Sequence, residues 1–406
     1  MARELAISLY LFVFKFVFSL FNLLPLKDKT TFVISFGDNS QHVFEEMRRQ
    51  HIETEVVFLC KGSSVNIFNT YPGTKTIPFE AFHILNWLRS VYHLATSNYI
   101  LIDNYFGFLA AVQFRKRVEC IQLWHASGAM KKFGLEDESV QYRSKRAKQR
   151  FLDVYSRFDQ VIVGSDVMAD IYKKSFLLND QRILRTGIPR TDFFYNDNKK
   201  EAVLEALMRK HPEWSGKKVI LYAPTYRDYE LQHFSLQLDI EKMKTALDKE
   251  YIVIIRLHPA VRNSLDLAER YPDFLYDCSS SDYQINELLL VADILITDYS
   301  SIPFEFSLLR RPMIFFAYDL EQYKNERGLP EGFEENLPGP IVKNTDQIIE
   351  LIFENRFNIS LIEYYAEQWN KYSKGCSSAN LVRYMFLSKK ASSSAAKKIQ
   401  LTDASR

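Results

Sequence analysis

The sequence predicts an α/β protein in which two doubly wound, Rossmann-like domains face each other, preceded by an amphipathic membrane helix. Short apolar runs rich in Val and Ile alternate with amphipathic stretches, a pattern typical of parallel sheets covered by helices. The length of 406 residues favours two domains, because a single hydrophobic core rarely grows that large. Polar residues recur where the predicted strands end, which is where open α/β sheets bind ligands.

The first expected element is a membrane-associating helix within residues 1–29. Residues 5–24 (LAISLYLFVFKFVFSLFNLL) are about long enough to cross a bilayer. The polar residues of this region form one stripe at helical spacing: Glu4, Ser8, Lys15, Ser19 and Asn22. The stripe favours a monotopic helix in the membrane interface, where Lys15 reaches the headgroups and Lys27 and Lys29 add attraction to anionic lipid. A single span, a buried core helix and a signal peptide are the alternatives, although no small-residue cleavage site follows.

Residues 30–190 are expected to form the first Rossmann-like domain. Its helices include the amphipathic stretches HVFEEMRRQ and FHILNWLRSVYHLA. Its strands are predicted at 30–37, 54–60, 98–104, 118–124, 160–166 and 182–188, most of them closed by Gly, Asp or Asn. A polar junction near residues 191–216 separates this domain from the second.

The second domain is expected to cover residues 191–388. Its predicted strands are 217–224, 251–259, 292–300 and 311–318. The remaining residues, 389–406, are low in complexity and predicted to be a disordered tail.

Composition and missing motifs exclude several classes of function. A net charge of +2 argues against a nucleic-acid partner. The four cysteines have no spacing that indicates a disulfide framework or a zinc site, so a reducing, cytosolic setting is expected. No GxxxxGK[ST] loop, no GxGxxG after a first strand and no D-x-D pair is present. We therefore predict no metal and no cofactor, and expect any phosphate charge to be met by Arg, Lys, His and helix ends.

Polar clusters follow four of the predicted strands. His125 follows one strand of the first domain, and His258 follows one of the second. The other two clusters lie in the second domain and are Thr225 with Arg227, and Asp298 with Ser300 and Ser301. Taken singly, each histidine is more often an ordinary turn residue, and the Asp-Tyr-Ser-Ser segment more often a helix cap. Hydroxyls at a helix N-terminus also suit a phosphate, and the shared strand-end position favours a common site.

Six segments in this order resemble the CDP-glycerol glycerophosphotransferases that build teichoic acids in Gram-positive bacteria. They are WHASGAMKKFG, VGSDVMADIY, GIPRTDFF, YAPTYRD, IIRLHP and TDYSSIPFEFSLLRRPMIFF, and the match runs from about residue 98 to 330. The resemblance implies a fold similar to GT-B glycosyltransferases, with an acceptor-side first domain and a CDP-donor-binding second domain. It also implies membrane association on the cytosolic face, peripheral or monotopic, which the apolar N-terminal segment supports independently.

The departure from the family pattern concerns the segment after His125. Longer polymerising relatives tend to have Trp-His-Gly-Thr-Pro, whereas this chain has Ala-Ser-Gly-Ala after the histidine. This difference, and the lack of a large extra N-terminal domain, resemble the primase branch, which adds the first glycerol phosphate to a polyprenyl-diphosphate-linked disaccharide. A polymerising glycerol- or ribitol-phosphate transferase, a GT-B nucleotide-sugar glycosyltransferase and a non-catalytic membrane-surface scaffold remain alternatives.

The resemblance also implies roles for individual residues. The family's Trp-His motif falls on Trp124 and His125, its Leu-His-Pro motif on residues 257–259, and its phosphate-binding Asp-x-Ser-Ser on Asp298, Ser300 and Ser301. Thr225 and Arg227 are expected in the donor pocket, and Arg190, in GIPRTDFF, is expected to contact substrate. The expected partners are CDP-glycerol, the lipid-linked disaccharide acceptor, an anionic membrane surface and other cell-wall synthesis enzymes.

Transfer of the glycerol phosphate requires a base for the acceptor hydroxyl and positive charge for the phosphate oxygens. We assign His125 as the base, and His258 with Arg227 as hydrogen-bond donors to the pyrophosphate; the roles of the two histidines can be exchanged.

Basic residues follow the first histidine. Lys131 and Lys132 are expected to bind substrate. In the run 143–150 (RSKRAKQR), Arg143, Arg146 and Arg150 are expected on one helical face. That face is either simply solvated, or it guides anionic headgroups and the acceptor pyrophosphate toward His125.

Overall fold

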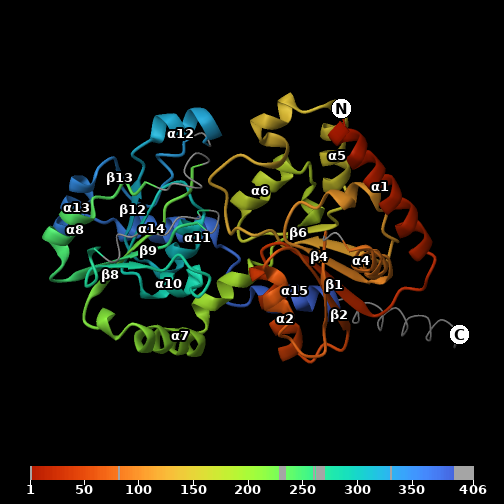
Figure 1. Cartoon of the computed structure of the whole chain (residues 1–406), viewed down its shortest axis with the longest axis horizontal. Coiled ribbons are helices and arrows are strands. Elements are labelled where there is room, and N and C mark those ends of the chain that lie inside the picture. Colours follow the sequence, from red (N-terminus) through yellow and green to blue (C-terminus); the bar gives the residue numbers. More distant parts are fainter. Residues whose placement is uncertain are drawn as a thin grey trace, which may run out of the picture. The chain divides into compact units, whose positions relative to one another are not determined.

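The computed structural model describes residues 2–80, 83–227, 235–258, 261, 270–329 and 332–387. The chain forms two compact units (Figure 1). Unit 1 contains residues up to 126, 133–192 and those from 372 onward, and unit 2 contains residues 127–132 and 193–371. Residues 372–387 thus lie in unit 1, and residues 127–132 in unit 2, whereas the sequence suggested boundaries at 190 and 388. The expected tail, 389–406, lies outside the described residues.

Unit 1 is built on a seven-stranded parallel sheet with the order β3-β2-β1-β4-β5-β6-β7. Its strands are β1 (Lys29–Ile34), β2 (Glu55–Cys60), β3 (Lys75–Pro78), β4 (Tyr99–Ile102), β5 (Glu119–Gln122), β6 (Gln160–Ile162) and β7 (Ile183–Leu184). Its helices are α1 (Ala2–Phe21), α2 (Asp38–Arg49), α3 (Ser64–Phe68), α4 (Ile84–Thr96), α5 (Lys145–Tyr155), α6 (Asp166–Ser175) and α15 (Ser377–Val382). The order places the topological switch point of a Rossmann sheet between β1 and β4.

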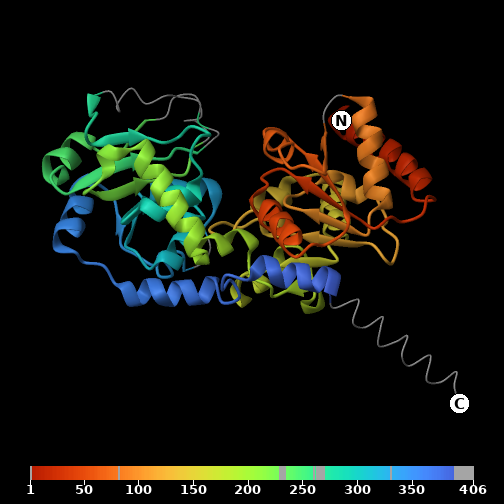
Figure 2. The same ribbon diagram turned by 90° about the horizontal axis from the view of Figure 1, so that it is seen from below.

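The end of the described chain completes the core of unit 1. Helix α15 lies beside α2 in both views (Figures 1 and 2). Leu381, Val382 and Met385 pack with apolar side chains of β1, β2 and α2, such as Phe32, and all of these are buried. This C-terminal segment, which the sequence analysis assigned to the second domain, therefore packs on the first sheet.

Unit 2 repeats the architecture with a six-stranded parallel sheet, ordered β10-β9-β8-β11-β12-β13. Its strands are β8 (Lys218–Tyr222), β9 (Tyr251–Ile255), β10 (Leu275–Asp277), β11 (Ile294–Thr297), β12 (Met313–Phe316) and β13 (Ile341–Val342). Its helices include α7 (Asp197–Lys210), α8 (Ile240–Leu247), α10 (Ile285–Val291), α11 (Ile302–Phe306), α12 (Leu320–Arg327), α13 (Thr345–Glu354) and α14 (Ile359–Trp369). Two apolar cores, one on each face of this sheet, show that helices cover it on both sides. Parallel α/β architecture is thus confirmed in both units.

Helix α1 forms as predicted, and one of its faces packs on the rest of unit 1. It packs on α4 and on the segment 107–111 through a face that buries Phe14 and Phe18. The Phe14 ring lies 5.7 Å from that of Trp87 and 5.3 Å from that of Phe108. The helix is long and apolar enough to cross a membrane, and only 11% of its most apolar window is buried, so it is not a core helix.

Lys29 does not contribute to a membrane surface, contrary to the expectation. It is the first residue of β1 and is completely buried. Its Nζ donates a hydrogen bond of 2.6 Å to Thr96 Oγ1 and lies 3.1 Å from His93 Nδ1. Burial lowers its pKa to about 8. A lysine held inside the sheet in this way cannot reach lipid headgroups.

Candidate active site

The backbone that presents His125 is held in a strained conformation. After β5 ends at Gln122, Trp124 adopts a φ of 54°, in the left-handed region that non-glycine residues rarely occupy. Gln122 Oε1 accepts a hydrogen bond of 2.9 Å from the Trp124 amide, and Asn39 Nδ2 donates one of 3.0 Å to the Trp124 carbonyl. Such strain persists only where neighbours fix it, and it concentrates at functional sites.

The His125 ring is fixed in one neutral tautomer. Its Nδ1 lies 3.1 Å from the Asp103 carbonyl oxygen, which can only accept, so Nδ1 carries the hydrogen. The ring stacks on Phe36, with centroids 4.1 Å apart, and on Trp124 at 4.6 Å. Burial, opposed by the hydrogen bond to Asp103 and assisted by the charge of Arg190, lowers the pKa of His125 to about 4. At neutral pH the ring is therefore uncharged, with Nε2 available as a proton acceptor.

Asp103 fixes the loop that carries Phe36. Its buried carboxylate follows β4 and accepts hydrogen bonds of 2.8, 2.9 and 2.9 Å from the amides of Ser35, Phe36 and Gly37, at the end of β1. Burial raises the pKa of Asp103 to about 6, and these three amides oppose the shift. Amides at this position bind the pyrophosphate in dinucleotide-binding domains, but here a carboxylate already occupies them.

Arg190 contacts the backbone of His125. It is 9% exposed, its Nη1 donates to the His125 carbonyl at 3.0 Å, and it pairs with Asp38 at 3.3 Å. Its backbone amide donates to Asn39 Oδ1 at 3.0 Å. Arg190 therefore positions the backbone of His125, and its expected contact with substrate stays a prediction.

Arg227 is the centre of a buried ion-pair cluster in unit 2. Its Nη2 lies 3.1 Å from Asp298 Oδ2, and its Nε and Nη2 donate to Asp319 at 2.7 and 2.9 Å. Nη1 donates to the Thr225 carbonyl at 2.6 Å. The cluster is nearly inaccessible, with 3% exposure for the Arg227 side chain and 2% for that of Asp298. Because a guanidinium has five N–H donors, one on Nη1 is not used by these four bonds.

Asp298 joins the ends of β8 and β11. Its carboxylate accepts hydrogen bonds from the amides of Thr225, at 2.8 Å, and Tyr299, at 2.6 Å. Burial raises the pKa of Asp298, and Arg227 opposes the shift. The two units therefore share one arrangement. Asp103, after β4, holds the loop that follows β1, and Asp298, after β11, holds the loop that follows β8. Each aspartate spans the switch point of its own sheet.

The two serines follow on the same loop. Ser300 Oγ accepts from the Ile302 amide at 3.2 Å and lies 3.1 Å from Thr297 Oγ1, so it caps α11. Ser301 is the N-cap residue, but its hydroxyl makes no capping bond. Both serines are half-buried. Helix α11 spans only five residues, so its dipole alone is a weak anion site.

His258 and Lys131 lie in the same unit. His258 is exposed, beyond the end of β9, with its ring 4.6 Å from that of Tyr226. Partial desolvation, together with the charges of Lys131 and Arg256, lowers the pKa of His258. Lys131 Nζ lies 5.1 Å from the centre of the Tyr323 ring. Lys131 thus brings positive charge to the histidine of unit 2, while Lys132 is exposed.

The segment 127–132 belongs to unit 2 because its side chains pack there. Ser127 Oγ donates to Glu305 Oε1 at 2.7 Å, and both groups are buried. A Cβ at Gly128 would lie 2.5 Å from the Phe304 ring, so this glycine permits close packing.

The basic run 143–150 forms the expected helical face only in part. Arg143 precedes α5, whose N-cap is Ser144, and its guanidinium lies 5.3 Å from the centre of the Phe151 ring. Arg150 pairs with Glu4 of α1 at 3.3 Å. Arg143 thus lies outside the helix, whereas Arg146 and Arg150 are one turn apart on α5 and both act on the charge of Glu4. The ion pair of Arg150 helps to hold α1 on unit 1.

The structure brings together several predicted residues within each unit. In unit 1 these are His125 and Arg190, and in unit 2 they are Thr225, Arg227 and Asp298, and His258 with Lys131. Pro259 lies outside the described residues. Sequence reasoning missed Phe36, Asp103, Asp319 and Tyr323, although Asp103 closes a predicted strand and that signal could have found it. Within the described part of the chain, no group of three or more His, Cys, Asp or Glu is placed to hold a metal ion, and the metal-free site stays a prediction.

The fold and these strand-end residues define a two-domain α/β enzyme of the kind that binds nucleotide-linked substrates. More specifically, the chain belongs to the CDP-glycerol:poly(glycerophosphate) glycerophosphotransferase family, whose model matches residues 16–387. It is a CDP-glycerol glycerophosphotransferase of teichoic acid synthesis, as the motifs predicted.

Similar proteins and a similar solved structure support the assignment of the chain to this family. The teichoic acid glycerol-phosphate primase of Bacillus subtilis (strain 168) is 37% identical over 383 residues, covering 94% of this chain and 98% of the relative. The teichoic acid poly(ribitol-phosphate) polymerase of Bacillus spizizenii is 35% identical over 361 residues, covering 87% of this chain and 55% of that protein. The wall teichoic acid polymerase TagF has a similar fold, with a TM-score of 0.78 at 23% identity over 97% of this chain and 99% of that chain.

Proposed function

We propose that this protein is a glycerol-phosphate primase. It transfers one glycerol phosphate from CDP-glycerol to a hydroxyl of a polyprenyl-diphosphate-linked disaccharide and releases CMP. Near-complete coverage of a named primase at 37% identity supports this choice of reaction. The strand order of the two sheets supports a GT-B-like class, and the apolar face of α1 supports a position on the cytosolic side of the membrane.

His125 is the general base in this proposal, and the observation that carries the assignment is its tautomer. The Asp103 carbonyl holds the hydrogen on Nδ1, and the low pKa keeps Nε2 unprotonated at neutral pH. Nε2 takes the proton of the acceptor hydroxyl as its oxygen bonds to the β-phosphorus of CDP-glycerol. The bond between that phosphorus and the bridging oxygen breaks, and CMP leaves with the bridging oxygen and its electron pair.

Unit 2 holds the CDP side of the donor. A neutral His258 donates one hydrogen bond to a pyrophosphate oxygen, and Lys131 beside it supplies positive charge. The free Nη1 hydrogen of Arg227 and the Ser301 hydroxyl are further donors, with Thr225 and Ser300 at the same strand ends. Lys132 and Arg190 contribute positive charge without a specified contact. The alternative is that His258 is the base and His125 the hydrogen-bond donor to the pyrophosphate. In that case an unprotonated nitrogen of His258 has to face the acceptor hydroxyl.

The reaction is tested by supplying CDP-glycerol and a lipid-linked disaccharide, and then weighing the product. One added glycerol phosphate with release of CMP is expected. A ladder of products would identify a polymerase, transfer only from CDP-ribitol would identify the ribitol branch, and release of UDP from UDP-sugars would identify a glycosyltransferase.

Substitution of the histidines separates catalysis from a scaffold role. His125→Gln and His258→Gln should each lower kcat by about 10² to 10⁴ while binding to vesicles is retained. Glutamine preserves polarity and approximate size, so a loss of folding would be visible as a shift in thermal unfolding. Unchanged transfer in both variants would refute the assigned chemistry.

A further inference from the structure

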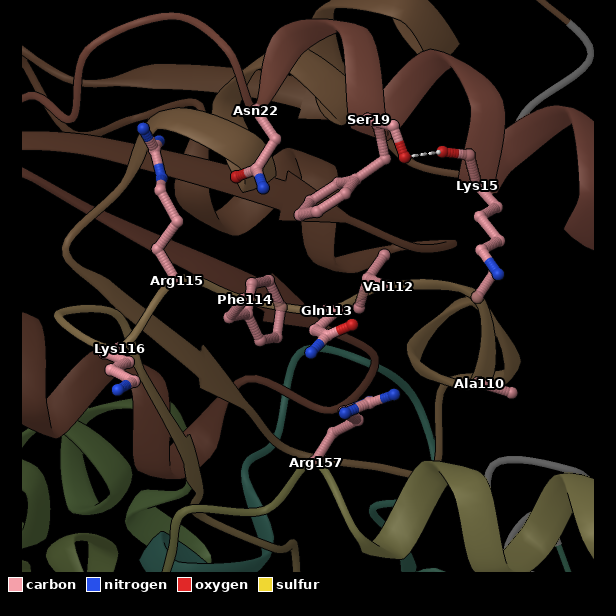
Figure 3. A pocket seen from close by; sticks show the side chains of 12 residues that line it. Lys15, Ser19, Asn22, Ala110, Val112, Gln113, Phe114, Arg115, Lys116 and Arg157 are labelled. Carbon is pink, nitrogen blue, oxygen red and sulfur yellow. Dashed lines mark hydrogen bonds between the residues drawn. The ribbon is translucent and has the colours of Figure 1, made fainter.

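A basic pocket lies beside helix α1. It has a volume of about 440 Å³ and lies between the last turns of α1, the segment 110–116 and Arg157 (Figure 3). Its lining includes Lys15, Arg115, Lys116 and Arg157, and no acidic residue. Ser19, Asn22 and Gln113 add neutral polar groups. Four cations without an acid indicate an anionic ligand.

Two arginines that line the pocket have unsatisfied donors. The Nε atoms of Arg115 and Arg157 are both buried and have no hydrogen-bond partner among the described residues. Arg115 is otherwise fixed, because its Nη1 and Nη2 donate to the carbonyls of Leu24 and Ala95 at 2.7 and 2.6 Å. Buried donors are satisfied in most proteins, so two of them in one basic pocket point to a group that accepts hydrogen bonds.

Arg157 forms no salt bridge with any residue in the described part of the chain. Asp159 is close enough to feel its charge, but that carboxylate accepts from the Cys120 amide at 2.8 Å and does not line the pocket. Lys15 and Lys116 are exposed and have no ion pair with any residue that the structure describes. Positive charge is therefore available to a ligand.

The pocket lies at one edge of the apolar surface of α1. At about 100° per residue, the buried face around Phe14 and Phe18 and the exposed face are on opposite sides of the helix. The exposed apolar residues of α1 include Leu5, Leu9, Phe12, Val13, Phe16 and Leu20, and exposed Leu23 and Leu24 follow the end of the helix. Ser8, Lys15 and Ser19 occupy the strip between these two faces, and Lys15 and Ser19 line the pocket. Exposed Ile84 and Leu85, at the start of the neighbouring α4, extend the apolar surface.

We infer that this pocket binds the phosphate of a membrane lipid whose acyl chains lie against the exposed face of α1. A helix in the membrane interface places its polar edge at the depth of the lipid phosphates. Arginine is suited to phosphate because its planar group donates two parallel hydrogen bonds. The polar stripe of the sequence thus has a specific role, since it forms one wall of a lipid phosphate site. This inference uses the proposed membrane location and does not depend on the proposed transfer reaction.

The test measures binding of the full chain to vesicles by sedimentation. Vesicles of phosphatidylcholine are compared with the same vesicles containing phosphatidylglycerol, and with vesicles containing a polyprenyl diphosphate. The pocket variant carries both Lys116→Gln and Arg157→Gln. The control is Lys174→Gln, which changes an exposed lysine on α6 that does not line the pocket. Arg115 is left intact because its two carbonyl contacts support the fold.

Neutralising two charges should weaken binding to anionic vesicles by roughly 25-fold, about fivefold per charge, and leave binding to phosphatidylcholine unchanged. Selective loss on phosphatidylglycerol would identify a phospholipid headgroup as the ligand, and selective loss on the polyprenyl diphosphate would identify a lipid diphosphate. Thermal unfolding and transfer to a soluble short-chain acceptor should be unchanged, so failure of this site is distinguishable from failure of the catalytic proposal.

A diffuse electrostatic attraction gives a different result. It depends on charge alone, so Arg157→Lys would then bind anionic vesicles as well as the unmodified chain does. A phosphate site requires the guanidinium, so Arg157→Lys should recover only part of the binding. Full recovery in Arg157→Lys, or equal losses in the pocket variants and in Lys174→Gln, would overturn the inference.

Discussion

Removal of the Phe36 ring should raise the pKa of His125 and move the acid limb of activity to higher pH. The ring lies 4.1 Å from the imidazole and is half-exposed, so Phe36→Ala admits water to the histidine at little cost to the core. Burial is the main reason that the pKa of His125 is about 4, where an exposed histidine has about 6.5. The difference corresponds to roughly 3 kcal/mol in favour of the neutral ring.

The sign of the effect follows from the role of the ring as a base. With a pKa of about 4, roughly 97% of the rings are neutral at pH 5.5, so the unmodified enzyme should lose almost no activity between pH 7.5 and 5.5. If Phe36→Ala restored the full value of 6.5, only about 9% would be neutral at pH 5.5, and kcat/KM would fall by about tenfold there. A smaller rise in the pKa of His125 gives a smaller loss of kcat/KM at pH 5.5, and activity at pH 7.5 stays nearly unchanged.

The assay combines kcat/KM across this pH range with an NMR titration of the imidazole, assigned by comparison with His125→Gln. Ile67→Ala is the matched control, because Ile67 is a comparably exposed apolar residue of α3 in the same unit. An unmodified His125 that titrates near 6.5, or a Phe36→Ala profile that coincides with that of Ile67→Ala, would refute the reasoning.

Three further predictions concern unit 2. Arg227→Gln should destabilise unit 2 by about 3 to 5 kcal/mol in urea unfolding, because it leaves two buried carboxylates without their cation; a loss below about 1 kcal/mol would contradict this. Gly128→Ala should cost about 1 to 3 kcal/mol by forcing a methyl group against Phe304, and an unchanged unfolding midpoint would show that the loop moves freely. Lys131→Gln should raise the pKa of His258 in an NMR titration, because a nearby cation lowers it, whereas Lys132→Gln, the exposed neighbour, should have a smaller effect.

The longer elements of the fold were predictable from the chain because their apolar runs are continuous. The runs at 54–60 and 251–259 contain the central parts of two buried parallel strands, β2 and β9. The edge strands β3, β10 and β13 have two to four residues and no such run, so their pairing depends on a sheet that is already formed. Helix α15 was not predicted, and its return to unit 1 depends on tertiary packing that no local pattern encodes.

The candidate site was predictable only in part. Strand-end position identified His125 and His258, because chemistry at that edge follows from sheet topology. The partners that set their properties come from other loops: Phe36 and Asp103 surround the first histidine, and Lys131 lies close to the second. Such pairings join residues far apart in sequence, and only a folded chain brings them together.

The two aspartates that bridge the switch points have a consequence for the catalytic cycle. Asp103 and Asp298 each tie the loop after the first strand to the end of the neighbouring strand. These loops are therefore ordered during folding, and under the proposed function substrate binding does not have to order them at every turnover. More of the binding energy of the substrate can then stabilise the transition state of glycerol-phosphate transfer.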